Sequence, residues 1–472
     1  MENTQNRFVY LDNIRNFLVY NVVLLHVISM FAYPLSFWWA VIDKEGSSRF
    51  YETSLIPMGI YLMPCLLFIA ALFIFPSLKK STSLEYVKNR FMRLCVPVIV
   101  FLFCAGDVFN QLRLKRLNPV SPDYSETFLN FWGAFVNMPG IYLTSSQKTL
   151  NTVDFSFSHI WFLTLLFFIT LVVVLLSLPF KRKNSEPKKL NSRKKNILQT
   201  IIFAVVLSIV YAAAMINYVS HHIDFGSWII IGKGIQFNLD KIWILIPMFL
   251  FGLYAYKKEW LTRGDTGNWK MWGVLAFIPL ALYVLLYHIG ILPTLDEILK
   301  VVEHNMQFDN KIAVPVADGS VQLSFLCSWI LLPPACVFLL MFSLSFTKKF
   351  FNKPNLITSF CSKHSINVYI LHYIPVIILQ SVFVNVPITP ILKILLMTVI
   401  VIPACLWLSH RLVYPYPKAA IAFFVALKLA ALAAGFTFYY YALLSLIFIS
   451  FAGALYESAR VMVARKAGLK SA

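Results

Sequence analysis

The sequence predicts an all-α protein, a polytopic transmembrane helical bundle with about ten core spans and two possible C-terminal spans. Of its 472 residues, 59% are hydrophobic and 13% are charged, and the mean hydropathy is +0.72. About a quarter of the residues of a soluble domain are charged, so the composition excludes an ordinary soluble fold. The apolar residues also fall into runs of membrane-spanning length, and basic residues gather between alternate runs.

Ten apolar runs have the length that a membrane-spanning helix needs. In chain order they lie near residues 10 to 33, 54 to 77, 92 to 111, 158 to 180, 197 to 219, 241 to 257, 271 to 291, 320 to 346, 364 to 385 and 388 to 410. Two less regular runs follow, near 417 to 434 and 437 to 457; Lys428 interrupts the first, and Gly435 marks a tight turn between them. We expect a transmembrane domain over residues 1 to 412 and C-terminal spans with a basic tail over residues 413 to 472.

The charge distribution predicts the orientation of the spans. The formal net charge is +20, from 41 basic and 21 acidic residues, and its basic clusters follow every second span, as in the run KRKNSEPKKLNSRKK at 181 to 195. By the positive-inside rule both chain ends are cytoplasmic. Because these clusters orient the protein and contact anionic lipid, they do not indicate a nucleic-acid partner. The seven cysteines show no metal-ligand spacing, so no metal site is predicted.

The first span carries two polar residues that are expensive to bury in a bilayer, Arg15 and His26. At about 100° per residue, eleven positions leave them roughly 20° apart on one face of a helix. An ionisable residue inside a span indicates a functional site by default. The alternative is that Arg15 reaches the cytoplasmic surface beside Asp12 and that His26 is a packing residue.

A second basic cluster, Arg90 and Arg93, stands at the cytoplasmic entry to the third span, just ahead of Pro97. Residues three apart project to one side of a helix, so the two guanidiniums are candidates to hold two oxygens of a phosphate or diphosphate. Arg15 is expected at the same depth, which makes the three arginines a predicted anion site. The alternative is that Arg90 and Arg93 are ordinary positive-inside anchors.

Two more polar clusters interrupt the spans. His159 and Trp161 open the fourth span, where a ring and an imidazole are suited to binding a sugar, and Asp154 is a candidate to orient His159. Tyr369 and His372 share a face of the ninth span, with His372 about 12 Å along a continuous helix and at a depth comparable to His26. The alternatives are an interfacial tryptophan and a core histidine bonded to a carbonyl.

Taken together and in order, these motifs resemble the acyltransferase-3 family of integral-membrane acyltransferases, over residues 7 to 412. The form H-I-W-F-L, with no acidic residue soon after it, is most similar to the branch that contains the periplasmic-glucan succinyltransferase, glucan biosynthesis protein C. The residues that carry the resemblance are Arg15 and His26, Arg90 and Arg93 followed by Pro97, His159 to Leu163, and Ser365 to Tyr373 as S-x-x-x-Y-x-x-H-Y.

The resemblance implies transfer of an acyl group, acetyl or succinyl, from a cytoplasmic acyl-CoA to a hydroxyl of an extracytoplasmic or lipid-linked glycan. Acyl-CoA is then the donor substrate, a glycan or lipid-linked sugar is the acceptor, and a bacterial inner membrane is the expected location. Arg15 and His26 match the essential Arg and His of the family, and Arg90 with Arg93 match its cytoplasmic Arg pair.

A thioester is already a good acyl donor, so the enzyme must mainly deprotonate a hydroxyl, stabilise an oxyanion and align the reactants. We expect the three arginines to hold the CoA phosphates and His26 to act as general base. His372 or Tyr369 is expected to donate to the oxyanion, and His159 with Trp161 to position the acceptor. Direct transfer and a covalent acyl-enzyme are both open.

One departure from the family is Ala70 and Ala71, in LLFIAALF, where the family usually has a Ser-Gly pair. It encourages one alternative, a sensor or scaffold that has lost catalysis. The other alternative is a transporter or flippase for an anionic or sugar-bearing lipid, which would use the same basic and histidine residues as a substrate path.

Overall fold

The computed structural model describes residues 8–33, 36, 39–117, 123–144, 155–178, 192–221, 227–260, 267–293, 297 and 319–466. Its N-terminal elements are α1 (Val9–Ile28), η1 (Ser29–Phe31), α2 (Arg49–Leu72), α3 (Ile74–Leu78), α4 (Ser83–Ala105), α5 (Val108–Leu117), α6 (Tyr124–Asn137), β1 (Ile141–Thr144), η2 (Ser158–Ile160) and α7 (Trp161–Ser177). Next come α8 (Arg193–Ser220), β2 (Trp228–Ile231), β3 (Ile235–Asn238), α9 (Ile242–Lys257), α10 (Trp269–Leu286), η3 (Tyr287–Ile291) and α12 (Gly319–Phe350). The last elements are α13 (Leu356–Leu371), α14 (Tyr373–Phe383), α15 (Pro390–Leu408), η4 (Ser409–Val413), α16 (Pro417–Ala434) and α17 (Phe436–Lys466).

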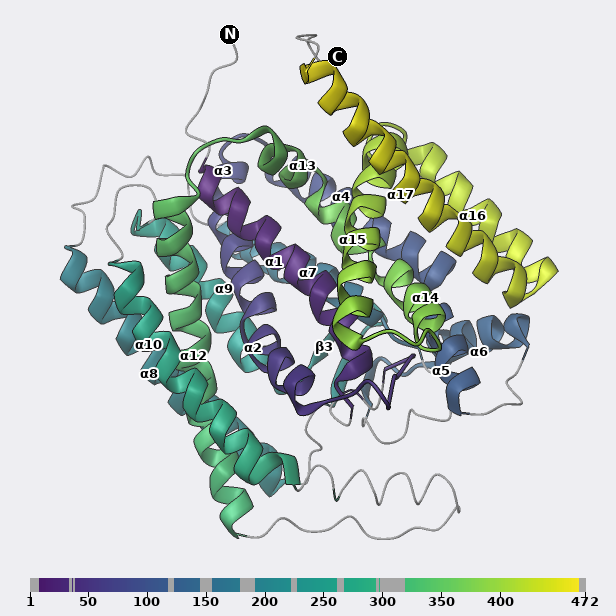
Figure 1. Cartoon of the computed structure of the whole chain (residues 1–472). Helices are drawn as coiled ribbons and strands as arrows, with labels where there is room; N and C mark the ends of the chain where they lie inside the picture. The colour runs from purple at the N-terminus through teal and green to yellow at the C-terminus, as the bar shows by residue number, and fades with distance from the viewer. Residues whose placement is uncertain are drawn as a thin grey trace.

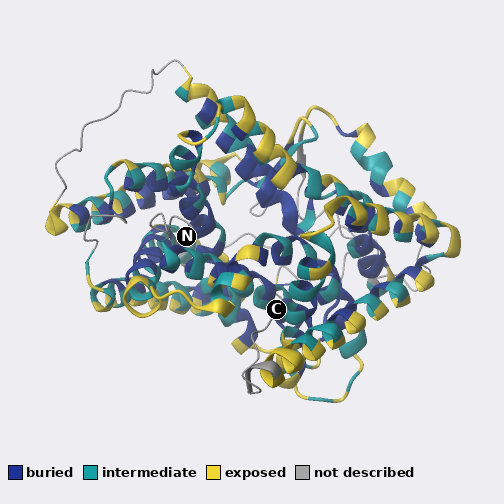
Figure 2. Cartoon of the chain, turned by 90° about the horizontal axis from the view of Figure 1, so that it is seen from above, coloured by how far each residue is buried: buried dark blue, intermediate teal, exposed yellow. Residues whose placement is uncertain are grey.

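The predicted polytopic helical bundle is confirmed. Within the described ranges, ten helical segments are long and apolar enough to cross a membrane, and the two C-terminal runs are among them. The outer helices expose apolar side chains such as Ile209, Phe277 and Val399, as lipid-facing helices do. Figure 2 shows buried residues on the helix faces turned toward the middle of the bundle and exposed residues around its margin.

Two predicted spans differ from the expectation of a regular helix. The run near 241 to 257 is α9, of only 16 residues, because a β-hairpin occupies the chain up to Asn238. The run near 364 to 385 is broken into α13 and α14, which meet at an angle of 61° at His372. Pro375 explains the break, since proline has no amide hydrogen to donate and its ring clashes with the carbonyl four residues earlier.

A small antiparallel sheet, in the order β1-β2-β3, was not expected from the sequence. Its middle strand pairs Trp228 with Thr144 on one side and with Asn238 on the other. Gln236 of β3 accepts a hydrogen bond of 2.7 Å from the backbone amide of Phe157, just before η2. The sheet therefore holds the chain just before η2, which carries His159 and leads into α7.

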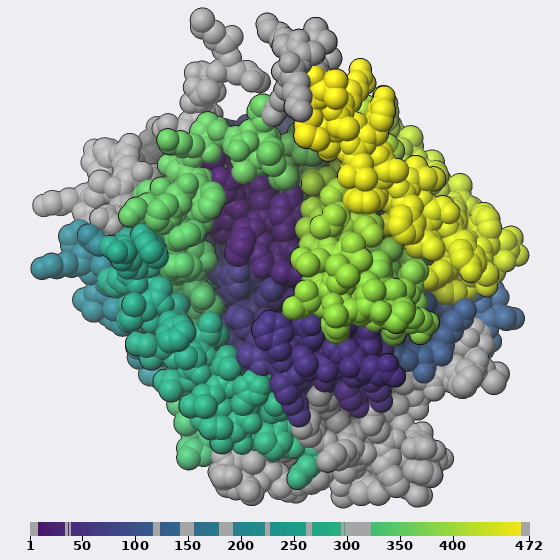
Figure 3. Space-filling model, viewed as in Figure 1, coloured from purple at the N-terminus to yellow at the C-terminus, as the bar shows by residue number. Residues whose placement is uncertain are grey.

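Helix α1 lies inside the bundle, in contact with α2, α12, α13, α14 and α15 (Figure 1). On the face drawn in Figure 3, it is seen between α12 and α13 on one side and α15 on the other. Helices α8, α10 and α12 pack together on one flank, and α16 and α17 pack against each other and against α4, α14 and α15 on the opposite flank. Residues of α1 are thus placed to meet side chains from distant parts of the chain.

Candidate active site

Helix α1 joins two polar regions of the protein, one around Arg15 and one around His26. Arg15 is half-buried near the start of the helix. Its Nη2 donates to Asp12 Oδ1 at 3.1 Å and to Ser362 of α13, at 2.6 Å to Oγ and 3.2 Å to the carbonyl oxygen. His26 lies in the last turn of α1, about 16 Å from Arg15 by helical rise.

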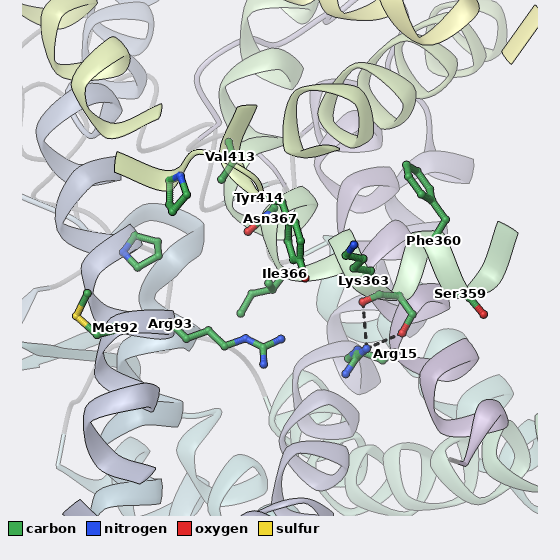
Figure 4. Close-up of a pocket in the computed structure, with 13 residues that line it drawn as sticks. Arg15, Met92, Arg93, Ser359, Phe360, Lys363, Ile366, Asn367, Val413 and Tyr414 are labelled. Atoms are coloured by element: carbon green, nitrogen blue, oxygen red, sulfur yellow. Dashed lines mark hydrogen bonds between the residues drawn. The ribbon is translucent and has the colours of Figure 1, made fainter. Parts of the chain in front are cut away.

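Arg15 lines a pocket of about 840 Å³ that opens between α1, α4, α13 and the start of α16. Figure 4 shows the Arg93 side chain extending from α4 into this pocket on the side of Arg15. Lys363 also lines it, with Nζ 4.3 Å from the ring centroid of Tyr414. Among the described lining residues three are basic and none is acidic, so the pocket suits an anion. The lining is completed by Met92, Pro97, Ser359, Phe360, Ser362, Ile366, Asn367, Val413 and Pro417.

Arg90 is not among the residues that line the pocket. Its Nε donates to the hydroxyl of Tyr86 at 3.1 Å, and its guanidinium lies 5.2 Å from the centroid of the same ring. Tyr86 is four residues earlier in α4, so it meets Arg90 along the helix surface. Of the predicted pair, Arg93 therefore lines the pocket and Arg90 lies against Tyr86.

The second polar region is a cluster of three histidines, which we call the histidine cluster. The ring centroid of His26 is 5.3 Å from that of His372 and 6.3 Å from that of His159, and His159 and His372 are 4.9 Å apart. Tyr373 stacks on His159 at 4.5 Å, and Trp39 stacks on His26 at 5.2 Å. The structure thus brings together three histidines from α1, η2 and the α13–α14 break, which are far apart in the sequence.

The break between α13 and α14 builds this cluster. Around it, the His372 amide donates to Val368 and the Val376 amide donates to His372, both at 3.0 Å, while Pro375 has no amide hydrogen to offer. His159 Nε2 lies 3.0 Å from the carbonyl oxygen of Tyr369 and 3.2 Å from that of Ile370. The imidazole therefore satisfies carbonyl groups at the end of α13.

These contacts decide which ring nitrogens carry protons. His159 Nε2 faces carbonyl oxygens, and His372 Nδ1 lies 3.1 Å from the Val368 carbonyl oxygen, so each of these nitrogens must donate. The opposite nitrogens, His159 Nδ1 and His372 Nε2, are buried without a hydrogen-bond partner among the described residues. In a neutral imidazole those two nitrogens are acceptors.

This arrangement does not support the predicted oxyanion donors. Neutral His372 has no second N–H to donate, because its proton is on Nδ1. The hydroxyl of Tyr369 donates to the His159 carbonyl oxygen at 2.6 Å. Each group has its proton directed to a backbone carbonyl, so donation to an oxyanion would first require that hydrogen bond to break.

His26 is the most accessible member of the histidine cluster. Its side chain is half-buried, whereas His159 is 6% exposed and His372 is 0% exposed. Its Nδ1 is buried and has no hydrogen-bond partner in the described part of the chain. Of the three histidines, His26 keeps the most exposed surface, so it is the one that a small molecule can reach most directly.

Trp161 lies outside the histidine cluster. Its ring packs edge-on against Trp228 of β2, at 5.4 Å, and against Phe162, at 6.2 Å. The structure therefore separates Trp161 from His159, with which we expected it to act. Asp154, the predicted orienting residue for His159, and residues 181–191 of the basic run lie outside the described residues.

Several residues of the two regions were missed from the sequence, among them Trp39, Gln380 and Tyr414. Gln380 is a buried polar residue in the apolar helix α14, and that interruption was the signal available. Trp39 and Tyr414 lie in connecting segments where an aromatic residue carries no such signal.

The Ala70 and Ala71 departure lies at the end of α2. Ala71 is buried where α2 meets α9, and a Cβ atom on Gly252 of α9 would come within 2.8 Å of the Ala71 Cβ. Small residues allow two helices to approach this closely. In this chain the alanines therefore have a packing role.

A proline replacement tests whether the α13–α14 break is needed. In Pro375→Ala the helix gains the missing amide, so we expect α13 and α14 to straighten and the His159 and His372 rings to move relative to His26. Misplacement by about 1 Å can cost about 100-fold in rate, so we expect a loss of about 10- to 100-fold in activity with little loss of folded protein. The control is Pro403→Ala, in α15, which should change the rate little. Full activity in Pro375→Ala would contradict this role.

A family model described as an acyltransferase domain matches residues 8–410, a range that includes the histidine cluster and the three basic residues of the pocket. It ends before α16 and α17 begin. No curated protein and no solved structure matches the chain.

Proposed function

The chain belongs to the acyltransferase-3 family and is an integral-membrane acyltransferase, and on this premise we propose that it moves an acetyl or succinyl group from cytoplasmic acyl-CoA to a hydroxyl of an extracytoplasmic or lipid-linked glycan. The H-I-W-F-L motif supports succinyl as the first donor to try. We place the protein in a bacterial inner membrane with both chain ends in the cytoplasm, in keeping with the basic loops. The start of α1 and the end of α17 lie at the same end of the bundle (Figure 1).

The observation that carries the proposal is that the same helices hold a basic pocket at one level and the histidine cluster at another. Along α1, Arg15 and His26 are eleven residues apart, and along α13, Ser362 and His372 are ten apart, which is about 15 to 16 Å of helical rise. The phosphates of CoA suit the basic pocket, because guanidinium groups bind phosphate oxygens with charge-assisted hydrogen bonds. The extended pantetheine arm then reaches toward His26.

In the proposed step, His26 takes the proton from the acceptor hydroxyl. The hydroxyl oxygen forms a bond to the thioester carbonyl carbon, and the bond from that carbon to sulfur breaks. The CoA thiolate leaves and takes the proton back from His26, so the imidazole ends neutral. His159 and His372 pack against the reacting imidazole, and their hydrogen-bonded tautomers leave the lone pairs of His159 Nδ1 and His372 Nε2 buried and unpartnered among the described residues.

The pocket arginine predicts a donor-specific defect. In Arg93→Gln we expect the KM for acyl-CoA to rise about 10- to 100-fold, because a hydrogen bond to a charged group contributes about 1.5–3 kcal/mol. The matched control is Arg90→Gln, three residues away on the same helix but outside the pocket, where we expect a change of less than about 3-fold. Steady-state kinetics with varied acyl-CoA and fixed acceptor measure both. Equal KM values in the two variants would argue against the pocket as the donor site.

The proposed function itself is tested by supplying labelled acetyl-CoA or succinyl-CoA to the cytoplasmic face of vesicles that contain the protein and native glycan acceptors. Label that moves into glycan or lipid-linked sugar supports the proposal and identifies the donor. Label that stays in acyl-CoA with both donors, in the presence of acceptor and correctly inserted protein, would overturn it.

A further inference from the structure

The indole of Trp39 lies against the imidazole of His26, although the two residues belong to different elements. The ring planes are nearly parallel, at 10°, and their centroids are 5.2 Å apart. Trp39 has no exposed surface. We propose, on the basis of the proposed function, that Trp39 is a positioning residue for His26, whose ring face stabilises the positive charge that the imidazole gains during transfer.

One buried amide holds both partners. Trp39 Nε1 donates to Gln380 Oε1 at 2.8 Å, and Gln380 Nε2 donates to the carbonyl oxygen of His26 at 2.9 Å and to that of Val27 at 3.2 Å. Both carbonyls lie in the last turn of α1, where the helix has no later backbone amide to donate to them. The indole and the backbone that carries the imidazole are therefore tied to the same side chain of α14.

The segment that carries Trp39 is also held in place by Asp43, four residues later in the chain. Asp43 Oδ2 accepts from Lys393 Nζ of α15 at 2.7 Å, and both side chains are nearly buried, at 8% and 6% exposed. The Asp43 amide donates to the carbonyl oxygen of Met30 at 2.9 Å. This segment is thus held against η1, directly after α1, on one side and against α15 on the other, which keeps the indole over His26.

The chemistry needs charge stabilisation at this ring. A cation within about 6 Å of an aromatic centroid is attracted to the ring face, and tryptophan gives the strongest attraction. Among the described residues, the other titratable side chains in ring contact with His26 are His159, His372 and Tyr373, and none of the three is a carboxylate. Because His26 is cationic only while it holds the acceptor proton, Trp39 stabilises the transition state more than the ground state.

Site-specific replacement of Trp39 with mono-, di- and trifluorinated tryptophans tests the inference in the full-length protein. Fluorine withdraws electron density from the ring face and keeps the shape and the indole N–H, so folding is preserved. We expect kcat to fall stepwise along the series, by about 2- to 30-fold in total, with the KM of both substrates unchanged. The matched control is the same series at Trp272, which is equally buried but packs against Phe338, where kcat should not change.

The outcomes separate the inference from the proposed function. If the unmodified protein transfers the acyl group and the Trp39 series leaves kcat flat, the inference is wrong and the proposed function stands. A series that changes KM alone would also overturn it, because the indole would then contact a substrate. If the unmodified protein transfers no acyl group, the proposed function is wrong and the inference fails with it.

Discussion

Replacing His26 with glutamine is expected to lower the rate of acyl transfer by about 100- to 10,000-fold, the contribution typical of a positioned general base. Glutamine keeps a polar side chain of similar length but cannot take a proton from a sugar hydroxyl. Since His26 is half-buried and its carbonyl, not its ring, is held by Gln380, the fold should tolerate the change. Transfer of label from acyl-CoA to glycan, normalised to the amount of folded protein, measures the effect.

The matched control is His288→Gln. His288 lies in η3, and its Nε2 contacts Thr53 Oγ1 of α2 at 2.7 Å, so its ring is engaged outside the histidine cluster. We expect its rate of transfer to stay within about 3-fold of the wild type, as for a substitution remote from the reacting groups. A rate in His26→Gln equal to that in His288→Gln would remove His26 from the mechanism and leave the chain without an identified base.

Replacing Lys428 with methionine is expected to destabilise the protein by about 3–5 kcal/mol, the typical cost of removing one partner from a buried ion pair. Lys428 Nζ of α16 donates to Asp107 Oδ2 at 2.7 Å and to the hydroxyl of Tyr124 at 2.6 Å, and both charged side chains are fully buried. In the variant the carboxylate of Asp107 stays buried without its cation. Thermal unfolding in detergent, followed by aggregation or by tryptophan fluorescence, measures the loss.

The double variant Asp107→Leu with Lys428→Met tests whether the loss of stability comes from the unpaired buried charge. Removing both charges leaves no unpaired group of either sign, so most of the lost stability should return. A single variant as stable as the wild type, or a double variant less stable than either single variant, would contradict this account. The pair matters to the architecture because it joins α16, which lies beyond residue 410, to the end of α4.

The largest part of the fold could be predicted from the sequence, because the signals for it are local. Apolar run length identifies membrane spans, and spacing along one run puts Arg15 and His26 on one helix face. The described structure confirms a polytopic bundle and places all twelve predicted runs in helices. The motifs that resemble the acyltransferase-3 family are likewise short and local, and residues 8–410 match that family.

The local signals failed where one residue changes the path of the chain. Periodicity predicted a continuous helix through His372, and Pro375 broke it by 61°. Spacing also predicted that Arg90 and Arg93 share one ligand; Arg93 lines the pocket and Arg90 contacts Tyr86, and the shared ligand stays a prediction. Pro375 was visible in the sequence, but its effect on the helix depends on the neighbours that the fold supplies.

The class of the protein, the approximate limits of its long apolar helices and the candidate site residues could be inferred from the sequence alone, because they follow from composition and short-range periodicity. Which of those residues meet depends on the tertiary structure. Trp39 and Gln380 are 341 residues apart, and His159 and Tyr369 are 210 apart, yet each pair is joined by a hydrogen bond. Such contacts depend on how whole helices pack and bend, and no short stretch of sequence contains that information.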